Sequence, residues 1–279
     1  MRAAVLVALH AVAACDDAGI DPITRITAPR VLAITTEPSA LALDGELALT
    51  VLTVDPAGPR RGLDVVRMRA CAPWKLIADP ARDCAGDDAL PLASDAAAGR
   101  VVTSAAELAA AFPAPPGVPA PPDPWRAALA AGLTLQVPII AEVTVDGQTL
   151  VARRDVDVVE PTVQRHNPRV AEIRFDGIPT RTLRAGQRYA LTATVERASL
   201  DPDPAADPPG ALETVVCHVF SPTGELSEPE LAIADPGAPV PETSPGSYTA
   251  GPPGTTWLFV VATDATGGLS ATSVPLTIE

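Results

Sequence analysis

The sequence TTWLFVVATDATGGLSATSVPLTIE (residues 255–279) contains two apolar runs, Trp257–Thr263 and Leu269–Ile278. Between them lies a turn, Asp264–Gly268, that carries two glycines. Runs rich in valine, threonine and leucine on either side of a glycine-bearing turn are typical of an antiparallel hairpin. We therefore expect this half of the chain to close with two paired strands.

The first half of the chain shows the same kind of ending. Leu135–Val145 and Gln148–Val159 are strand-like runs, and Asp146-Gly147 joins them. An Asp-Gly pair between alternating apolar runs is a strong hairpin signal. Earlier in this half, Leu47, Leu49 and Val51 alternate with other residues, which is the period of a half-buried strand.

An internal repeat relates the two halves. Each half has a Pro-Arg-Val step that leads to a glycine and then to an alternating strand. We therefore expect an all-β chain of two tandem antiparallel β-sandwiches. The repeated positions are Pro29, Arg30, Val31, Gly45, Leu49, Thr50, Val54 and Asp55, then Pro168, Arg169, Val170, Gly186, Leu191, Thr192, Val195 and Glu196.

Leu183–Val195 and the closing stretch resemble immunoglobulin-like modules of the polycystic-kidney-disease (PKD) type, which end in an alternating strand, an aspartate and glycine turn and a threonine-rich strand. The whole chain is similar to two-sandwich lipoproteins of unknown function that are abundant in myxobacteria. This resemblance implies an immunoglobulin-like fold and an envelope location, and it implies no activity.

The N-terminus resembles an export signal. Met1 and Arg2 precede the apolar stretch Ala3–Ala14, which is too short to span a bilayer as a helix. Val12-Ala13-Ala14-Cys15 resembles the lipobox of bacterial lipoproteins, so we expect Cys15 to be acylated and to hold the chain on a lipid bilayer. The alternative is an ordinary signal peptide that is cut after Ala14. Either way, we expect a protein of the bacterial cell envelope that faces the periplasm or the exterior.

The linker between the sandwiches is PTVQRHNP, with a proline at each end. Proline restricts the backbone, so we expect the two modules to be held apart as semi-rigid beads, with His166 as a solvated spacer. The expected segments are a signal peptide (residues 1–14), a tether (15–28), the first sandwich (29–160), the linker (161–167) and the second sandwich (168–279).

The first sandwich carries an insertion from about residue 87 to 132. Ser104 and Glu107 have the spacing of a capping box, and Asp123, Pro124 and Gly132 bracket a second short helix. The proline-rich stretch between them predicts extended polyproline II. Long insertions are often functional or disordered. We interpret this one as disordered, with Trp125 as the best contact residue if it is functional.

The formal net charge of −14 disfavours binding to nucleic acid or to anionic head groups. Lys75 is the single lysine and follows Trp74, so a phosphate-binding loop that ends in Gly-Lys is excluded. The sequence also lacks HExxH, GxSxG and CxxC motifs. We therefore expect a protein that is not an enzyme.

Three cysteines remain besides Cys15. Cys71 and Cys84 lie 13 residues apart across a turn-rich segment, and an oxidising compartment favours a disulfide between them. We expect Cys217 to be a small core residue. His218 follows it directly in a predicted strand, so the two side chains should point to opposite faces and form no catalytic pair.

Asp201, Asp203 and Asp207 share one loop of the second sandwich. Oxygen-rich loops at sandwich ends can hold calcium. The alternative is a solvated acidic loop that its prolines stiffen. Apart from this calcium hypothesis we expect no cofactor.

The leading functional hypothesis is a binding or spacer module that meets an envelope protein or glycan. One alternative is a carbohydrate-binding module, which would stack sugars on exposed aromatic rings such as Trp74, Trp125 and Trp257. Another is a hydrolase, which would need a cleft with converging polar groups.

Overall fold

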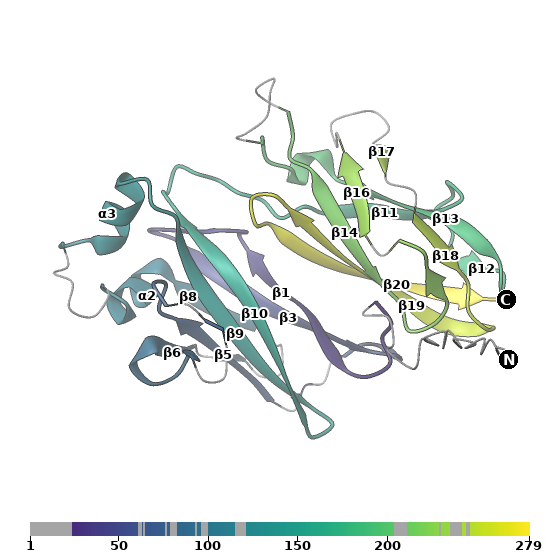
Figure 1. Cartoon of the computed structure of the whole chain (residues 1–279), viewed down its shortest axis with the longest axis horizontal. Helices are drawn as coiled ribbons and strands as arrows, with labels where there is room; N and C mark the ends of the chain where they lie inside the picture. Colours follow the sequence, from purple (N-terminus) through teal and green to yellow (C-terminus); the bar gives the residue numbers. More distant parts are fainter. Residues whose placement is uncertain are drawn as a thin grey trace, which may run out of the picture.

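The computed structural model describes residues 24–60, 63, 65–75, 77–78, 83–92, 94–95, 100–114, 121–203, 211–228, 230–234, 242–243 and 246–279. Its strands form four sheets, which make two sandwiches side by side (Figure 1). The signal peptide and Cys15 lie outside the described residues. Within those residues, no helix is long and apolar enough to cross a bilayer.

The first sandwich pairs a sheet of order β1-β3-β8-β7, with β4 on β3, against a sheet of order β2-β10-β9-β5-β6. The bounds are β1 Arg30–Glu37, β2 Leu41–Ala42, β3 Glu46–Asp55, β4 Gly58–Pro59, β5 Val65–Cys71, η1 Gly86–Asp88, β6 Ala89–Leu92, β7 Ser94–Asp95, β8 Arg100–Ser104, α2 Ala105–Ala111, α3 Pro124–Ala130, β9 Leu135–Val145 and β10 Gln148–Val159.

The second sandwich pairs β11-β13-β18-β15 against β12-β20-β19-β14-β16-β17. The bounds are β11 Val170–Phe175, β12 Thr182–Leu183, β13 Arg188–Val195, η2 Arg197–Ser199, β14 Val215–Phe220, β15 Glu225–Leu226, β16 Glu230–Ala234, β17 Glu242–Thr243, β18 Gly246–Thr249, β19 Gly254–Asp264 and β20 Leu269–Ile278.

The two sandwiches repeat one another down to an irregularity in the first strand. β1 pairs antiparallel with β3 and its register shifts between Val31 and Ala33, while β11 pairs with β13 and shifts between Val170 and Glu172. In each half a two-residue strand then lies parallel to the last strand, β2 on β10 and β12 on β20. The chain is thus two tandem immunoglobulin-like sandwiches.

Alternating side chains build each core. In β3, Leu47, Leu49 and Val51 point inward and are buried with residues of the facing sheet. The hairpin between β9 and β10 turns at Asp146 and Gly147, whose φ angles are 50° and 75°. Positive φ at both central residues is the geometry that an Asp-Gly turn favours, so this predicted hairpin is confirmed.

The insertion packs on the first core instead of being disordered along its length. Ser104 and Glu107 form the predicted capping box at the start of α2, and Asp123 caps α3. Trp125 is only 2% exposed, and its indole N–H donates to the backbone carbonyl of Phe112 at 2.9 Å. The idea of Trp125 as a surface contact was wrong, because this ring completes the core under the helices. Residues 115–120 of the proline-rich stretch lie outside the described part of the chain.

The predicted disulfide between Cys71 and Cys84 is confirmed, with the two Cα atoms 5.5 Å apart. The bridge joins the end of β5 to the segment before η1. Ile77 and Ile140 pack around it in a small cluster of their own.

The two sandwiches are in contact, and the expectation of separated beads was wrong. The sheet that holds β1 and β3 and the sheet that holds β14 and β19 face each other. Both sheets carry apolar side chains on their outer faces, and these outer faces pack together. Trp257 and Phe259 stack at 9° between ring planes on the second sandwich, and Ile26 of the N-terminal segment is fully buried beside them. The remaining members of this apolar interface are Leu32, Leu52, Val54 and Phe220.

The N-terminal segment closes this interface as an added strand. Arg25 forms a parallel bridge with Ser221, just after β14. The Ser221 N–H donates to the carbonyl of Thr24 at 3.0 Å, and the Ile26 N–H donates to the carbonyl of Ser221 at 3.1 Å. The end of the predicted tether is therefore part of the folded unit.

Candidate functional site

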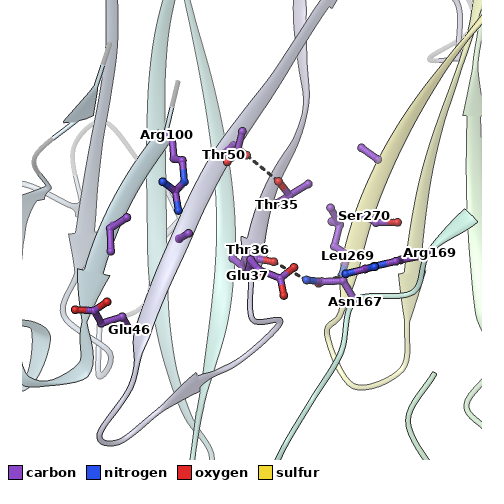
Figure 2. Close-up of a pocket in the computed structure, with 13 residues that line it drawn as sticks. Thr35, Thr36, Glu37, Glu46, Thr50, Arg100, Asn167, Arg169, Leu269 and Ser270 are labelled. Atoms are coloured by element: carbon purple, nitrogen blue, oxygen red, sulfur yellow. Dashed lines mark hydrogen bonds between the residues drawn. The ribbon is translucent and has the colours of Figure 1, made fainter. Parts of the chain in front are cut away.

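A groove lies beside the apolar interface, where the two sandwiches diverge (Figure 2). Its volume is about 690 Å³, within the range of ligand-binding clefts. The first sandwich supplies its floor from the outer face of β1, β3 and β8. The linker and the first residues of β20 supply the opposite wall.

Strand alternation places polar side chains on the groove floor. Leu47 and Leu49 of β3 point into the core, so Glu46, Ala48 and Thr50 point outward. Thr50 lies directly across from Thr35 of β1, whose hydroxyl donates to the Thr50 carbonyl at 3.2 Å. The hydroxyl-rich floor thus follows from the pattern that builds the core.

Four charged side chains line the groove. Arg100 comes from β8 and Arg169 directly precedes β11, while Glu37 and Glu46 come from β1 and β3. Within the described residues, none of the four forms an ion pair with another protein group. Both signs of charge are therefore free to meet an external partner.

Asn167, the single asparagine of the chain, joins the two walls. Its side-chain Nδ2 donates to the carbonyl of Thr36 in β1, and its Oδ1 accepts from the backbone N–H of Leu269 in β20, the latter at 2.9 Å. A carboxamide offers a donor and an acceptor in one plane, so this one side chain can bond both walls at once. Sequence reasoning assigned Asn167 no role, although its position beside a linker proline was visible.

The turn between β19 and β20 is held by two arginines. Arg154 of β10 donates to the carbonyl of Gly267, and Arg165 of the linker donates to the carbonyl of Thr266 at 2.8 Å. Arg165 also pairs with Asp157 of β10. Burial lowers the pKa of Arg154, and the nearby carboxylates of Asp264 and Asp157 oppose that shift. The linker is thus bonded to both sandwiches.

His166 is not the free spacer that we expected. Its backbone N–H and its ring Nδ1 lie 2.7 Å and 2.6 Å from the two carboxylate oxygens of Asp201. Both carboxylate oxygens of Asp201 therefore contact the linker. No three histidine, cysteine or acidic residues in the described ranges are grouped to hold a metal ion. The backbone N–H of Asp203 donates to the backbone carbonyl of Ala211. Asp207 lies outside the described residues, so calcium binding stays a prediction.

Cys217 is a core residue, as predicted. It is fully buried in β14, and burial raises the pKa of its thiol to about 12, so the reactive thiolate is disfavoured. His218 faces the other side of the strand, with Nδ1 3.4 Å from a carboxylate oxygen of Glu230. The two side chains form no catalytic pair.

None of the three tryptophans is exposed. Trp125 is buried, Trp74 packs edge-on against Phe112, and Trp257 stacks on Phe259 in the interface. A sugar-binding platform needs open aromatic faces, whereas Trp125 is buried and Trp74 and Trp257 are half-buried against other rings.

No family model and no curated protein matches the chain. Among solved structures it is similar to the D00-D0 domain of intimin, at 12% identity over 90% of this chain and 100% of that one, with a TM-score of 0.26. It is also similar to fibronectin(III)-like modules of CbhA from Clostridium thermocellum, at 11% identity over 90% and 94%, with a TM-score of 0.23. Red sea bream transglutaminase matches at 10% identity over 91% of this chain and 32% of that one, with a TM-score of 0.29. Scores this low assign none of these proteins' activities to this chain.

Proposed function

We propose that this chain is a non-enzymatic binding module of the cell envelope, anchored by lipid, that presents the groove between its sandwiches to a partner. The groove carries this proposal, because its four charged side chains form no ion pair among the residues that the structure describes. An extended polar segment with both signs of charge, from an envelope protein or a charged glycan, suits such a lining. The bonded linker and the apolar interface support the role, because they hold the two walls in one geometry before a partner arrives.

The groove is tested by reversing its positive charges. The Arg100→Glu, Arg169→Glu double variant should lose a partner that the wild type retains from a detergent-solubilised envelope fraction. Arg67→Glu is the matched control, because Arg67 is exposed on β5 and lies outside the groove. Retention in the wild type and in the control should weaken with added salt, which screens exposed charges. Equal retention by the double variant and the control would refute the groove as the contact.

The anchor belongs to the same proposal. Eight residues separate Cys15 from Thr24, and a fully extended chain of that length reaches about 30 Å. Since Thr24 is bonded to Ser221, an acylated Cys15 would hold the second sandwich within about 30 Å of the lipid surface. The position of the first sandwich in the chain therefore does not place it closer to the membrane than the second sandwich.

Membrane fractionation of a Cys15→Ala variant tests the anchor. The wild type should sediment with membranes and the variant should stay in the soluble envelope fraction. A variant that still sediments with membranes would show that lipid on Cys15 is not what holds the protein there. This test is independent of the groove, so either part of the proposal can fail alone.

A further inference from the structure

One hydroxyl at the junction of the two sandwiches lies between two carboxylates. The Thr266 Oγ1 is 3.0 Å from Oε2 of Glu213 and 3.1 Å from Oδ1 of Asp264. A hydroxyl has one proton and can donate to only one acceptor at a time. With both carboxylates charged, the hydroxyl donates to only one of them and places its lone pairs against the other.

A proton on Glu213 resolves this conflict. The protonated Oε2 can donate to Thr266 Oγ1, and the hydroxyl can then donate to Asp264, so that a chain of two hydrogen bonds forms. The other oxygen of Glu213 accepts from the backbone N–H of Asp201 at 3.0 Å. Glu213 is fully buried, and this burial raises the pKa of its carboxyl to about 7. The hydrogen bonds from the Asp201 N–H and Thr266 oppose the rise in pKa, while the negative charges of Asp264 and, least, Asp201 add to it.

The charged groups around this cluster come from every element that packs on it. Asp201 lies in the loop after η2 and is bonded to His166 of the linker. Asp264 ends β19, and its Oδ2 is buried without a hydrogen-bond partner within the described residues. Arg154 of β10 and Arg165 of the linker are the nearby positive groups, and both bind carbonyls of the turn.

The cluster is mechanically connected to the first sandwich. Asp264 Oδ1 also accepts from the backbone N–H groups of Thr266 and Gly268, at 2.9 Å and 2.7 Å, so it shapes the turn. The same turn offers its carbonyls to Arg154 and Arg165. A change at Glu213 therefore reaches the contact between the sandwiches through two hydrogen bonds.

We propose that Glu213, Thr266 and Asp264 form a proton-dependent latch that holds the β19–β20 turn on the first sandwich. In the protonated state the hydrogen-bond chain is complete and the turn is docked. On deprotonation two carboxylates compete for one hydroxyl beside a third, Asp201, and the turn loosens its hold on Arg154 and Arg165. The latch sets how firmly the two sandwiches are joined. This proposal does not depend on whether the groove binds a partner.

Pulsed electron-spin distance measurements test the latch. Labels at Val151→Cys and Ile178→Cys, both exposed and one on each sandwich, are placed in the full chain with Cys15→Ser to keep the N-terminus unlabelled. The wild type should show one narrow distance at pH 5.5 and a broader distribution at pH 8.5, with a midpoint near pH 7. Glu213→Gln should stay narrow at both values, because its amide can donate to Thr266 without titrating.

Glu225→Gln is the matched control, since this exposed carboxyl of the second sandwich lies outside the cluster and should leave the pH response unchanged. A wild-type distance that is constant with pH, or a Glu213→Gln variant that still broadens, overturns the latch. If Glu213→Gln fails to fold, Thr266 gives a second test. Thr266→Ser should keep the response, and Thr266→Val should be broad already at pH 5.5. A valine variant that behaves like the wild type also overturns the proposal.

Discussion

Truncation of Ile26 should detach the N-terminal segment from the interface between the sandwiches. Ile26 is fully buried against Val54 and Phe259, and Ile26→Ala removes three carbon atoms at about 0.8 kcal/mol each. Cavities in a rigid core add to such losses. Here the segment can peel away, so we expect about 2–3 kcal/mol in all, a factor of about 30 to 150 in the opening equilibrium.

Amide hydrogen exchange at Ser221 reports this opening, because its N–H donates to Thr24 of the same segment. Ile26→Ala should speed that exchange by the factor above and leave the core amides of β19 protected. Ile178→Ala makes the same deletion at a side chain that is 62% exposed and should leave Ser221 unchanged. If Ser221 exchanged at the wild-type rate in Ile26→Ala, the segment would not be held by this side chain.

Three further predictions follow from single contacts. Gly58→Ala should loosen the interface, because a Cβ there would lie 2.6 Å from the indole nitrogen of Trp257 and the φ of +132° is strained for alanine. Small-angle scattering should show a larger radius of gyration for this variant than for the wild type. An unchanged scattering curve would contradict the close packing at Gly58. Replacing Cys71 and Cys84 by serine should lower the free energy of unfolding in urea titrations by about 3 kcal/mol. It should also remove the two-hydrogen increase in mass that the wild type shows on reduction. A wild type without that increase in mass would lack the disulfide. Between pH 4.5 and 7 the folded state keeps a proton on Glu213 that the unfolded chain has lost. The free energy of unfolding of the wild type, measured relative to Glu213→Gln, should therefore fall by about 3 kcal/mol as the pH rises through that window and then level off. If the two proteins gave parallel curves of unfolding free energy against pH, the pKa of Glu213 would not be raised.

The repeat in the sequence predicted much of the fold. Pro29-Arg30-Val31 and Pro168-Arg169-Val170 mark the same place in two sandwiches, including the register shift that follows each valine. Local chemistry also predicted the Asp-Gly hairpin, the helix caps and the disulfide, because each depends on residues that are close along the chain.

The contact between the sandwiches was not predicted, since the alternation of β3 was interpreted as having one buried face. Leu52 and Val54 are apolar at outward positions, and Phe259 lies in a run of β19 that is apolar on both faces. Such a run is typical of a strand that is covered on both sides. The sequence therefore indicated that both faces of this strand are covered. It did not indicate which segment covers the outer face, because that depends on how two distant segments dock.

The groove was harder to predict than the interface. Arg100, Arg169 and Glu37 look like ordinary solvated strand residues in the sequence. Only the docking of the sandwiches brings them to one groove, where their side chains form no ion pair with the part of the chain that the structure describes. Glu213 and Thr266 likewise lie 53 residues apart, and no local pattern marks them as a pair.

The central claim is that the two sandwiches and the N-terminal segment form one unit with a fixed groove. Residual dipolar couplings of the full chain at pH 6, where Glu213 is protonated, test it most directly. The backbone couplings of both sandwiches should fit a single alignment tensor in the geometry described above. Two tensors of different magnitude, one for each sandwich, would show that the modules move independently and would contradict the account.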